Sequence, residues 1–236
     1  MSLPDAREED VVAIAGRLET LHERMAQACQ QAGRQPGEVT LIGVTKTFPL
    51  ETVAAALEAG LRDLGENRAQ ELAAKAAATP PDACRWHMIG HLQRNKARIV
   101  VQRAFMFHAL DSLRLADALE RRAQEEGRIL PCLVQVNISG EATKSGVEPA
   151  DAHDVLEALT SRDHLRIKGL MTLAAPAADP EKVRPQFREM RRLFDAASMP
   201  GMMMLSMGMS NDFEVAIEEG ATHIRVGSAI FGPRGG

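Results

Sequence analysis

The stretch Val39-Thr-Leu-Ile-Gly-Val-Thr-Lys-Thr-Phe-Pro-Leu-Glu-Thr-Val-Ala-Ala-Ala-Leu-Glu-Ala-Gly60 joins an apolar run to a helical segment. Hydrophobic and β-branched residues fill 39–45, which is typical of a buried strand. Residues 50–59 have the composition of a helix, which Gly60 ends. A strand that leads directly into a helix is the repeating unit of α/β proteins. The same unit recurs along the rest of the chain.

Seven further strand-like runs follow, most of them with a helical segment after them. The runs lie near 61–65, 85–89, 104–109, 130–137, 165–170, 202–206 and 222–227. The helical segments lie near 67–78, 92–102, 112–126, 149–160, 180–197 and 210–219. Eight such units in 236 residues predict an α/β protein with a (β/α)8 TIM barrel, as one domain over 1–236. An open doubly wound sheet is the alternative, although no G-x-G-x-x-G follows the first strand.

A long helix is expected before the barrel, over residues 5–32. Val11, Ile14 and Leu18 begin an apolar series that recurs at three- and four-residue steps. Gly33 ends the pattern. The apolar stripe predicts that this helix packs on the barrel.

Composition and charge limit the classes of partner. Hydrophobic residues make up 45 % and charged residues 25 %, as in globular proteins, and the net charge is −4. Without a basic surplus, nucleic acid is not expected as a partner. The charged N-terminus and the lack of apolar runs of about 18 residues argue against a signal peptide and a membrane span. Cys29, Cys84 and Cys132 are scattered, which predicts free thiols and a cytoplasmic location.

Lys46 is the first candidate for chemistry, because barrel sites lie at the C-terminal ends of the strands. It follows the apolar run that ends at Thr45. Partial desolvation there disfavours the ammonium form, and the free amine is the nucleophile that forms an imine with an aldehyde. The alternative is a lysine that extends its charge into solvent.

Two further strand ends carry polar residues. Asn67 follows Gly65-Glu66 and can orient a ring substituent or cap helix 67–78, and the cap is favoured by the local sequence. His87 and His91 have a spacing that resembles paired metal ligands. Gly90 and the absence of an H-E-x-x-H pattern argue against that role, so no metal site is predicted.

Two segments have simpler interpretations. The loop 137–146 has the Ser, Gly and Thr content of a loop at the barrel mouth, with Lys144 as a candidate second cation or a solvated lysine. The methionine-rich stretch 199–209 reads as a buried strand, because flexible thioethers fill gaps in a core.

A phosphate site is predicted after the last two strands. Barrels frequently bind phosphate there with backbone N–H groups. Gly208 and Gly227 allow close approach of the backbone, and Ser206 and Ser228 supply hydroxyl groups. Arg225 can reach a ring nitrogen or an anion. An amine on the first strand and a phosphate site on the last two together indicate pyridoxal 5′-phosphate, which carries an aldehyde and a phosphate.

The whole chain resembles the pyridoxal phosphate homeostasis protein family, whose fold is similar to the N-terminal barrel of alanine racemase. The matching motifs are Val44-Thr-Lys46-Thr, Gly65-Glu-Asn67, Trp86-His-Met-Ile-Gly90, Leu92-Gln-Arg-Asn-Lys96, Val136-Asn137-Ile-Ser-Gly-Glu141, Gly169-Leu-Met171, Leu205-Ser-Met-Gly-Met-Ser210 and Arg225-Val-Gly-Ser-Ala-Ile-Phe-Gly232. The sequence departs from the family's commoner residues at Phe48, Arg68 and Ser228.

The resemblance implies roles for five residues in holding the cofactor. It implies that Lys46 carries pyridoxal phosphate as an internal aldimine and that Arg225 faces the pyridine nitrogen. It implies a phosphate site that includes Ser206, Gly227 and Ser228. Asn67 and Val226 are two further predicted cofactor-binding residues.

A non-catalytic role follows from two features. An arginine beside the pyridine nitrogen disfavours its protonation, which makes the ring a poorer electron sink. Alanine racemases use a tyrosine of a separate domain as second base, and this chain has no tyrosine and ends at Gly236. We therefore expect a protein for storage, delivery or buffering of the cofactor.

The partners of such a protein would be PLP-dependent apoenzymes, and a monomer is expected. The alternatives are a low-activity PLP-dependent amino-acid racemase, a cofactor-free imine-forming aldolase and a structural adaptor.

Overall fold

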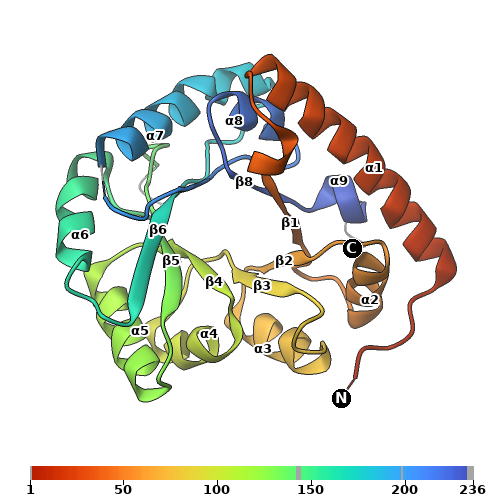
Figure 1. Ribbon diagram of the computed structural model, residues 1–236, viewed down its shortest axis with the longest axis horizontal. Helices are drawn as coiled ribbons and strands as arrows, with labels where there is room; N and C mark the ends of the chain where they lie inside the picture. The colour runs from red at the N-terminus through yellow and green to blue at the C-terminus, as the bar shows by residue number, and fades with distance from the viewer. Residues whose placement is uncertain (1, 142–144, 198, 233–236) are drawn as a thin grey trace.

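A closed barrel of parallel strands forms the centre of the molecule (Figure 1). The computed structural model describes residues 2–141, 145–197 and 199–232. The strands of this part of the chain are β1 (Thr40–Val44), β2 (Asp63–Glu66), β3 (Arg85–Met88), β4 (Met106–Leu110), β5 (Leu130–Gln135), β6 (Leu165–Met171), β7 (Met204–Ser206) and β8 (His223–Val226). Each strand pairs with the next, and β1 also pairs with β8, with Ile42 opposite Arg225. The predicted barrel is confirmed, and the open sheet is wrong because β1 and β8 close the ring.

Helices surround the barrel on its outer side, as Figure 1 shows. They are α1 (Glu8–Gln31), α2 (Leu50–Glu58), α3 (Ala69–Ala78), α4 (Ala97–Arg103), α5 (Leu113–Glu125), α6 (Ala152–Leu159), α7 (Arg184–Ala197), α8 (Phe213–Glu218) and α9 (Ser228–Phe231). Short 3-10 helices lie at Pro36–Glu38, Arg94–Lys96, Pro149–Asp151 and Pro180–Val183. The last three account for most of the difference from the predicted helix starts, because each makes up the first turn of a segment predicted to be α-helical.

The structure of the C-terminal part differs from the prediction in two places. The methionine-rich stretch 199–209 is not one buried strand, since β7 has only three residues and Met203 is 67 % exposed. The helix α9, which follows β8 directly, was not predicted.

The long N-terminal helix is present and packs on the outside of the barrel. Acidic residues Glu8, Glu9 and Asp10 fill the first turn of α1, where the helix dipole favours negative charge. Its buried side chains, which include Ile14 and Leu18, recur at three- and four-residue steps. They pack the helix against α2, α8 and α9, so α1 covers the strands that begin and end the barrel.

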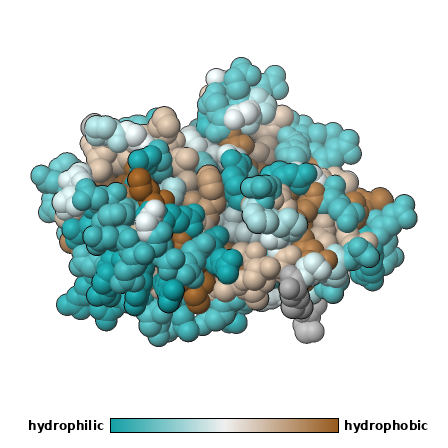
Figure 2. Space-filling view, turned by 60° about the horizontal axis from the view of Figure 1, so that its bottom comes forward, coloured by the Kyte–Doolittle hydropathy of each residue, from teal (hydrophilic) through white to brown (hydrophobic). Residues whose placement is uncertain are grey.

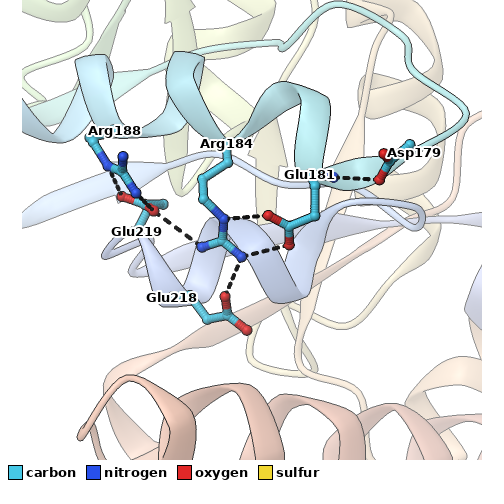
Figure 3. A network of polar contacts seen from close by, with 6 residues as sticks. All are labelled: Asp179, Glu181, Arg184, Arg188, Glu218 and Glu219. Carbon is cyan, nitrogen blue, oxygen red and sulfur yellow. Dashed lines mark hydrogen bonds and ion pairs between the residues drawn. The ribbon is translucent and has the colours of Figure 1, made fainter.

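A network of ion pairs connects the start of α7 to the end of α8 (Figure 3). The Arg184 guanidinium contacts Glu181 at 2.7 Å, Glu218 at 2.6 Å and Glu219 at 3.1 Å. Arg188 also pairs with Glu219, at 2.9 Å. The hydrogen bonds to Glu181 and to the other two carboxylates raise the pKa of Arg184. This network fixes the helices that follow β6 and β7, and therefore the loops that lead into them.

The surface drawn in Figure 2 is mainly hydrophilic, and its hydrophobic residues form small, separate groups. The large apolar side chains are instead concentrated in the core, between the barrel and the helices. In the described part of the chain, no helix is both long and apolar enough to cross a membrane.

Candidate functional site

A cavity of about 540 Å³ opens at the C-terminal ends of the strands. Its walls come from the ends of several strands and the loops after them, including those after β1, β2, β3, β7 and β8. Five of the residues singled out in the sequence line it together: Lys46, Asn67, Arg225, Gly227 and Ser228. The barrel therefore brings the predicted amine and the predicted anion-binding turn to one cavity, although 181 positions separate Lys46 from Gly227 (227 minus 46).

Ser206 and Val226 do not line the cavity, unlike the other predicted residues. Ser206 is completely buried, and its hydroxyl is engaged by Arg225 and His108. Val226 is buried in β8, where its backbone pairs with Gly43 of β1. The Ser206 hydroxyl, which we expected to bind the phosphate, is thus engaged inside the barrel instead. Ser210, which sequence reasoning did not select, lines the cavity instead, because it lies beyond the end of β7.

The backbone around Lys46 forms a tight turn directly after β1. Thr47 has a φ of 68°, in the left-handed region that side chains with a Cβ rarely adopt. Its N–H donates to Glu71 Oε2 at 3.0 Å, and the Phe48 N–H donates to the Thr45 carbonyl at 3.0 Å. Residues held in such conformations by their surroundings cluster at functional sites. This turn fixes the backbone from which the half-buried Lys46 side chain extends.

A buried ion pair lies in the wall behind Lys46 and Asn67. Lys75 Nζ donates to Glu66 Oε1 at 2.6 Å and to the Thr45 carbonyl at 2.7 Å. The Thr45 hydroxyl donates to the same carboxylate oxygen at 2.6 Å. Burial raises the pKa of Glu66, and the hydrogen bonds from Lys75 and Thr45 act in the opposite direction. Because Thr45 and Glu66 directly precede Lys46 and Asn67, this pair holds both cavity residues at a fixed separation.

Asn67 is not a helix cap, contrary to the interpretation that its local sequence favoured. The helix α3 begins at Ala69 with Arg68 as its N-cap, and no side chain caps it. Instead Asn67 contributes to the cavity wall. Gly90 packs against its backbone, since a Cβ at Gly90 would lie 2.3 Å from the Asn67 carbonyl oxygen. Only glycine fits there without moving the Asn67 backbone.

Arg225 brings a buried positive charge to the cavity. It is 3 % exposed, and its two terminal nitrogens donate to Ser206 Oγ at 2.5 Å and to the Thr172 carbonyl at 2.8 Å. Both acceptors are neutral. Burial lowers the pKa of Arg225 to about 10, while Asp212 acts to raise it. The guanidinium is therefore protonated at neutral pH, and the cavity favours a ligand that carries lone pairs or negative charge.

The turn after β8 is joined to the loop after β7. The Gly227 N–H donates to Ser210 Oγ at 3.3 Å, and Ser228 begins α9 beside them. Asp212 accepts from the Met209 N–H at 2.5 Å, which closes the loop after β7. Burial raises the pKa of Asp212, and the Met209 hydrogen bond opposes that change. Two hydroxyl groups and a glycine backbone thus lie at one side of the cavity.

His87 and His91 lie in different surroundings. His87 is buried inside the barrel and contacts Asp63 and His108, whereas His91 lines the cavity and contacts Asp111 at 2.8 Å. Within the described residues, no group of three or more His, Cys, Asp or Glu side chains is arranged to hold a metal. Lys144, the candidate second cation, lies outside the described residues, although its neighbour Ser145 lines the cavity.

The polar residues inside the barrel were not predicted from the sequence. Buried side chains of Asp63, His87, His108 and His223 project into the barrel from four strands. The available signal was a polar residue within an apolar run, as in Met106-Phe-His-Ala-Leu110. Such a residue in a barrel strand has to find a partner across the interior, which is otherwise apolar.

Comparisons with known proteins identify the family of this chain. A family model described as "Alanine racemase, N-terminal domain" matches residues 17–235. The chain belongs to this family. Among members of the alanine racemase N-terminal domain family, the pyridoxal phosphate homeostasis protein of Aquifex aeolicus is 40 % identical over 221 residues, covering 92 % of this chain and 97 % of that protein. The protein of the same name from Escherichia coli K12 is 38 % identical over 229 residues, with 94 % and 97 % covered.

A solved structure extends the comparison to three dimensions. PipY of Synechococcus elongatus, determined with PLP bound, is 35 % identical with a TM-score of 0.80, and the match covers 93 % of this chain and all of that one. The resemblance to the pyridoxal phosphate homeostasis proteins is therefore confirmed.

Proposed function

We propose that this chain binds pyridoxal 5′-phosphate through Lys46 and serves in the homeostasis of that cofactor, by storage, delivery or buffering. The observation that carries the proposal is the cavity itself. A lysine amine, a buried guanidinium and a turn with two hydroxyl groups line one space of about 540 Å³. Its relatives carry the name pyridoxal phosphate homeostasis protein, and the PipY structure was determined with PLP bound.

The residues present fit the chemical groups of the cofactor. Ser210 and Ser228 supply hydroxyl donors to a phosphate, and Gly227 lines the cavity between them. The neutral hydrogen-bond acceptors of Arg225 leave its charge available to a ring nitrogen lone pair. Lys46, Asn67 and Gly227 remain cofactor-binding residues in this proposal, with Ser210 in place of Ser206 and no direct role for the Val226 side chain.

When bound, pyridoxal phosphate supplies an aldehyde that an amine can attack and a ring that withdraws electrons. Lys46 supplies that amine. Arg225 disfavours a second positive charge on the ring nitrogen, which weakens electron withdrawal. The residues of this cavity are thus better suited to holding the cofactor than to sustained turnover, so we infer a non-catalytic carrier.

The wider setting of the protein is inferred from the same role. PLP-dependent apoenzymes are the proposed recipients, and the barrel with α1 is proposed to act as one domain and a monomer. The three cysteines are free thiols, which supports a cytoplasmic location.

The test is to locate the cofactor on the chain. Protein incubated with pyridoxal phosphate is reduced with borohydride, digested and examined by mass spectrometry. We expect the adduct on the peptide that contains Lys46, its loss in Lys46→Ala, and its retention in Lys168→Ala, which removes a half-buried lysine of β6. An adduct on another lysine, or none, would contradict the proposal.

A low-activity amino-acid racemase is a second candidate, favoured by His91. This side chain lines the cavity, and its Nδ1 lies 2.8 Å from Asp111 Oδ2, an arrangement that orients an imidazole as a general base. Incubation of the cofactor-loaded protein with single-enantiomer amino acids distinguishes the two functions. Racemisation that is lost in both Lys46→Ala and His91→Gln supports the racemase, and unchanged chirality supports the carrier.

A further inference from the structure

A continuous chain of hydrogen bonds runs through the interior of the barrel from its N-terminal end to Arg225. Arg85, the first residue of β3, contacts Asp63 through two nitrogens at 2.7 and 2.5 Å. Asp63 Oδ1 lies 2.9 Å from His87 Nε2. His87 Nδ1 lies 2.9 Å from His108 Nε2, and His108 Nδ1 lies 3.2 Å from Ser206 Oγ. Arg225 donates to the same Ser206 oxygen.

These contacts are consistent with one direction of donation along the whole chain. Burial raises the pKa of Asp63, but the hydrogen bonds from His87 and Arg85 outweigh it, so the net pKa is lowered and Asp63 is an ionised acceptor. His87 then donates from Nε2 and accepts at Nδ1, which requires His108 to donate from Nε2. His108 accepts at Nδ1 from the Ser206 hydroxyl. The Ser206 oxygen is left to accept from Arg225.

Both histidines are neutral at physiological pH, as this direction requires. Burial lowers the pKa of His87, while Asp63 acts to raise it. Burial lowers the pKa of His108 well below its usual value, and its interactions with His87, His223 and Arg225 act in the same direction. A neutral histidine with one donor and one acceptor nitrogen transmits the direction set by Asp63.

Among the groups around Arg225, Ser206 is the side chain that orients the guanidinium from inside the barrel. The Thr172 carbonyl of the segment after β6 accepts from the second terminal nitrogen at 2.8 Å. Asp212, from the loop before α8, acts on the charge of Arg225, and it already accepts from the Met209 backbone. His223 of the same strand lies near the histidine chain, with its ring centroid 6.2 Å from that of His108, and bonds to Thr222. Ser206 is therefore the side-chain acceptor that fixes the guanidinium from within the barrel.

We propose that Asp63, His87 and His108 are positioning residues that hold the Arg225 guanidinium at the cavity through Ser206. The carboxylate at one end of the barrel sets the histidine tautomers, and these present the Ser206 oxygen as an acceptor. Polarised hydrogen bonds of this kind strengthen one another in a low-dielectric interior. The effect on a bound pyridine ring rests on the proposed function, whereas the effect on Arg225 does not.

The first measurement uses the protein without any cofactor. Nitrogen-15 NMR distinguishes protonated from unprotonated ring nitrogens. We expect Nε2 protonated and Nδ1 unprotonated in both His87 and His108. Asp63→Asn removes the ionised acceptor and presents an amide donor, so we expect His87 to change tautomer and the Arg225 side-chain resonances to shift. The opposite tautomers in the unmodified protein, or unshifted Arg225 resonances in Asp63→Asn, would overturn the proposal.

The second measurement uses the cofactor as a probe of Arg225. His108→Phe keeps an aromatic ring and removes both hydrogen bonds. Loss of a hydrogen bond that supports a charged group corresponds to about tenfold weaker binding. We expect that loss of pyridoxal phosphate affinity together with a shifted absorbance maximum. His108→Gln retains a donor and an acceptor, so it should recover part of both changes. Unaltered affinity and absorbance in His108→Phe, with the adduct still on Lys46, would refute the positioning role.

Controls separate positioning from a general loss of stability. His164→Gln disrupts a different histidine–carboxylate pair, that of His164 with Glu120, which is not part of the hydrogen-bond chain to Arg225. Leu119→Ala removes a buried side chain of α5, on the outer layer. Neither should shift the Arg225 resonances or the absorbance maximum, and equal shifts in Leu119→Ala would contradict the proposal. If the unmodified protein forms no Lys46 adduct, the proposed function fails while the NMR experiment still decides the positioning role.

Discussion

Lys75 Nζ lies 2.6 Å from Glu66 Oε1, and the two side chains are 8 % and 0 % exposed. The pair lies behind the cavity. Glu66, which supplies the carboxylate, directly precedes Asn67 in the sequence. The second oxygen, Glu66 Oε2, is buried without a hydrogen-bond partner among the described residues. The carboxylate therefore depends on Lys75 and Thr45 for its stabilisation.

Lys75→Met should destabilise the protein strongly, because it leaves a buried carboxylate without its counter-ion. The expected loss in the free energy of unfolding is about 3–5 kcal/mol at pH 7, measured by urea denaturation. The loss should be smaller at pH 4, since protonation of Glu66 removes the uncompensated charge. Lys182→Met, at an exposed lysine, should change stability by less than about 0.5 kcal/mol. If Lys75→Met combined with Glu66→Leu is no more stable than Lys75→Met alone, the buried pair is not the cause.

Gly90→Ala should disturb the cavity wall at Asn67. Its Cβ would lie 2.3 Å from the Asn67 carbonyl oxygen, a backbone atom that cannot move without shifting β2's end. We expect a loss of about 1–3 kcal/mol by thermal or urea unfolding, the usual effect of overpacking. Gly16→Ala is the matched control, because Gly16 is exposed in α1 with nothing within 4 Å, and it should stabilise the protein by about 0.5–1 kcal/mol. Equal effects of the two substitutions would count against the close contact.

Stability should decrease as the pH falls from about 6.5 towards 4. Burial lowers the pKa of His223 to about 4, so in this range the unfolded chain binds a proton at His223 and the folded chain does not. The folded state therefore loses stability, by about 3 kcal/mol for His223 alone. His87 and His108 act in the same direction, whereas Glu66 and Asp212, whose pKa values burial raises, oppose the loss at the acidic end.

The contribution of His223 can be isolated by substitution. Urea denaturation between pH 4 and 7 should show a weaker pH dependence in His223→Asn than in the unmodified protein. His153→Asn, at an exposed histidine of α6, should leave the pH dependence unchanged. An identical pH profile in His223→Asn would show that this histidine is not the source.

Arg184→Ala should cost more stability than the loss of an ordinary surface ion pair. Three carboxylates contact Arg184, and its side chain is only 23 % exposed. We expect a loss of about 1–2 kcal/mol, more than isolated surface pairs give, and a smaller loss in 1 M salt because of screening. Arg192→Ala, which breaks an exposed pair with Glu189, should cost less than about 0.5 kcal/mol. Equal losses in thermal unfolding would contradict the role of the network.

The strands were predictable because each is an apolar run between turn residues, and their number then indicated a barrel. The rule that barrel sites lie at the C-terminal ends of the strands was sufficient to select Lys46 and Gly227. The exact ends of the elements were harder to predict. Asn67 looked like a helix cap because α3 begins two residues later than the helical pattern does, at Ala69.

Ser206 shows what sequence spacing alone could not provide. A hydroxyl at the end of β7 was expected in the cavity, yet its side chain points into the barrel, where Arg225 and His108 use it. The alternation of side chains along a strand decides this, and it requires the register between β7 and β8, which pairs Ser206 with His223. The histidine chain depends on the same registers across several strands, so no local pattern reveals it.

The pairing of β1 with β8 makes the cavity a property of the finished ring. Lys46 follows the first strand and Gly227 follows the last, so a chain in which the final strand has not yet docked has the amine but lacks the turn that lies beside it. A ligand that needs both contacts binds only after closure, and by mass action it draws the population towards the closed form. Binding and release of this ligand would thus change the fraction of molecules in which the ring is open.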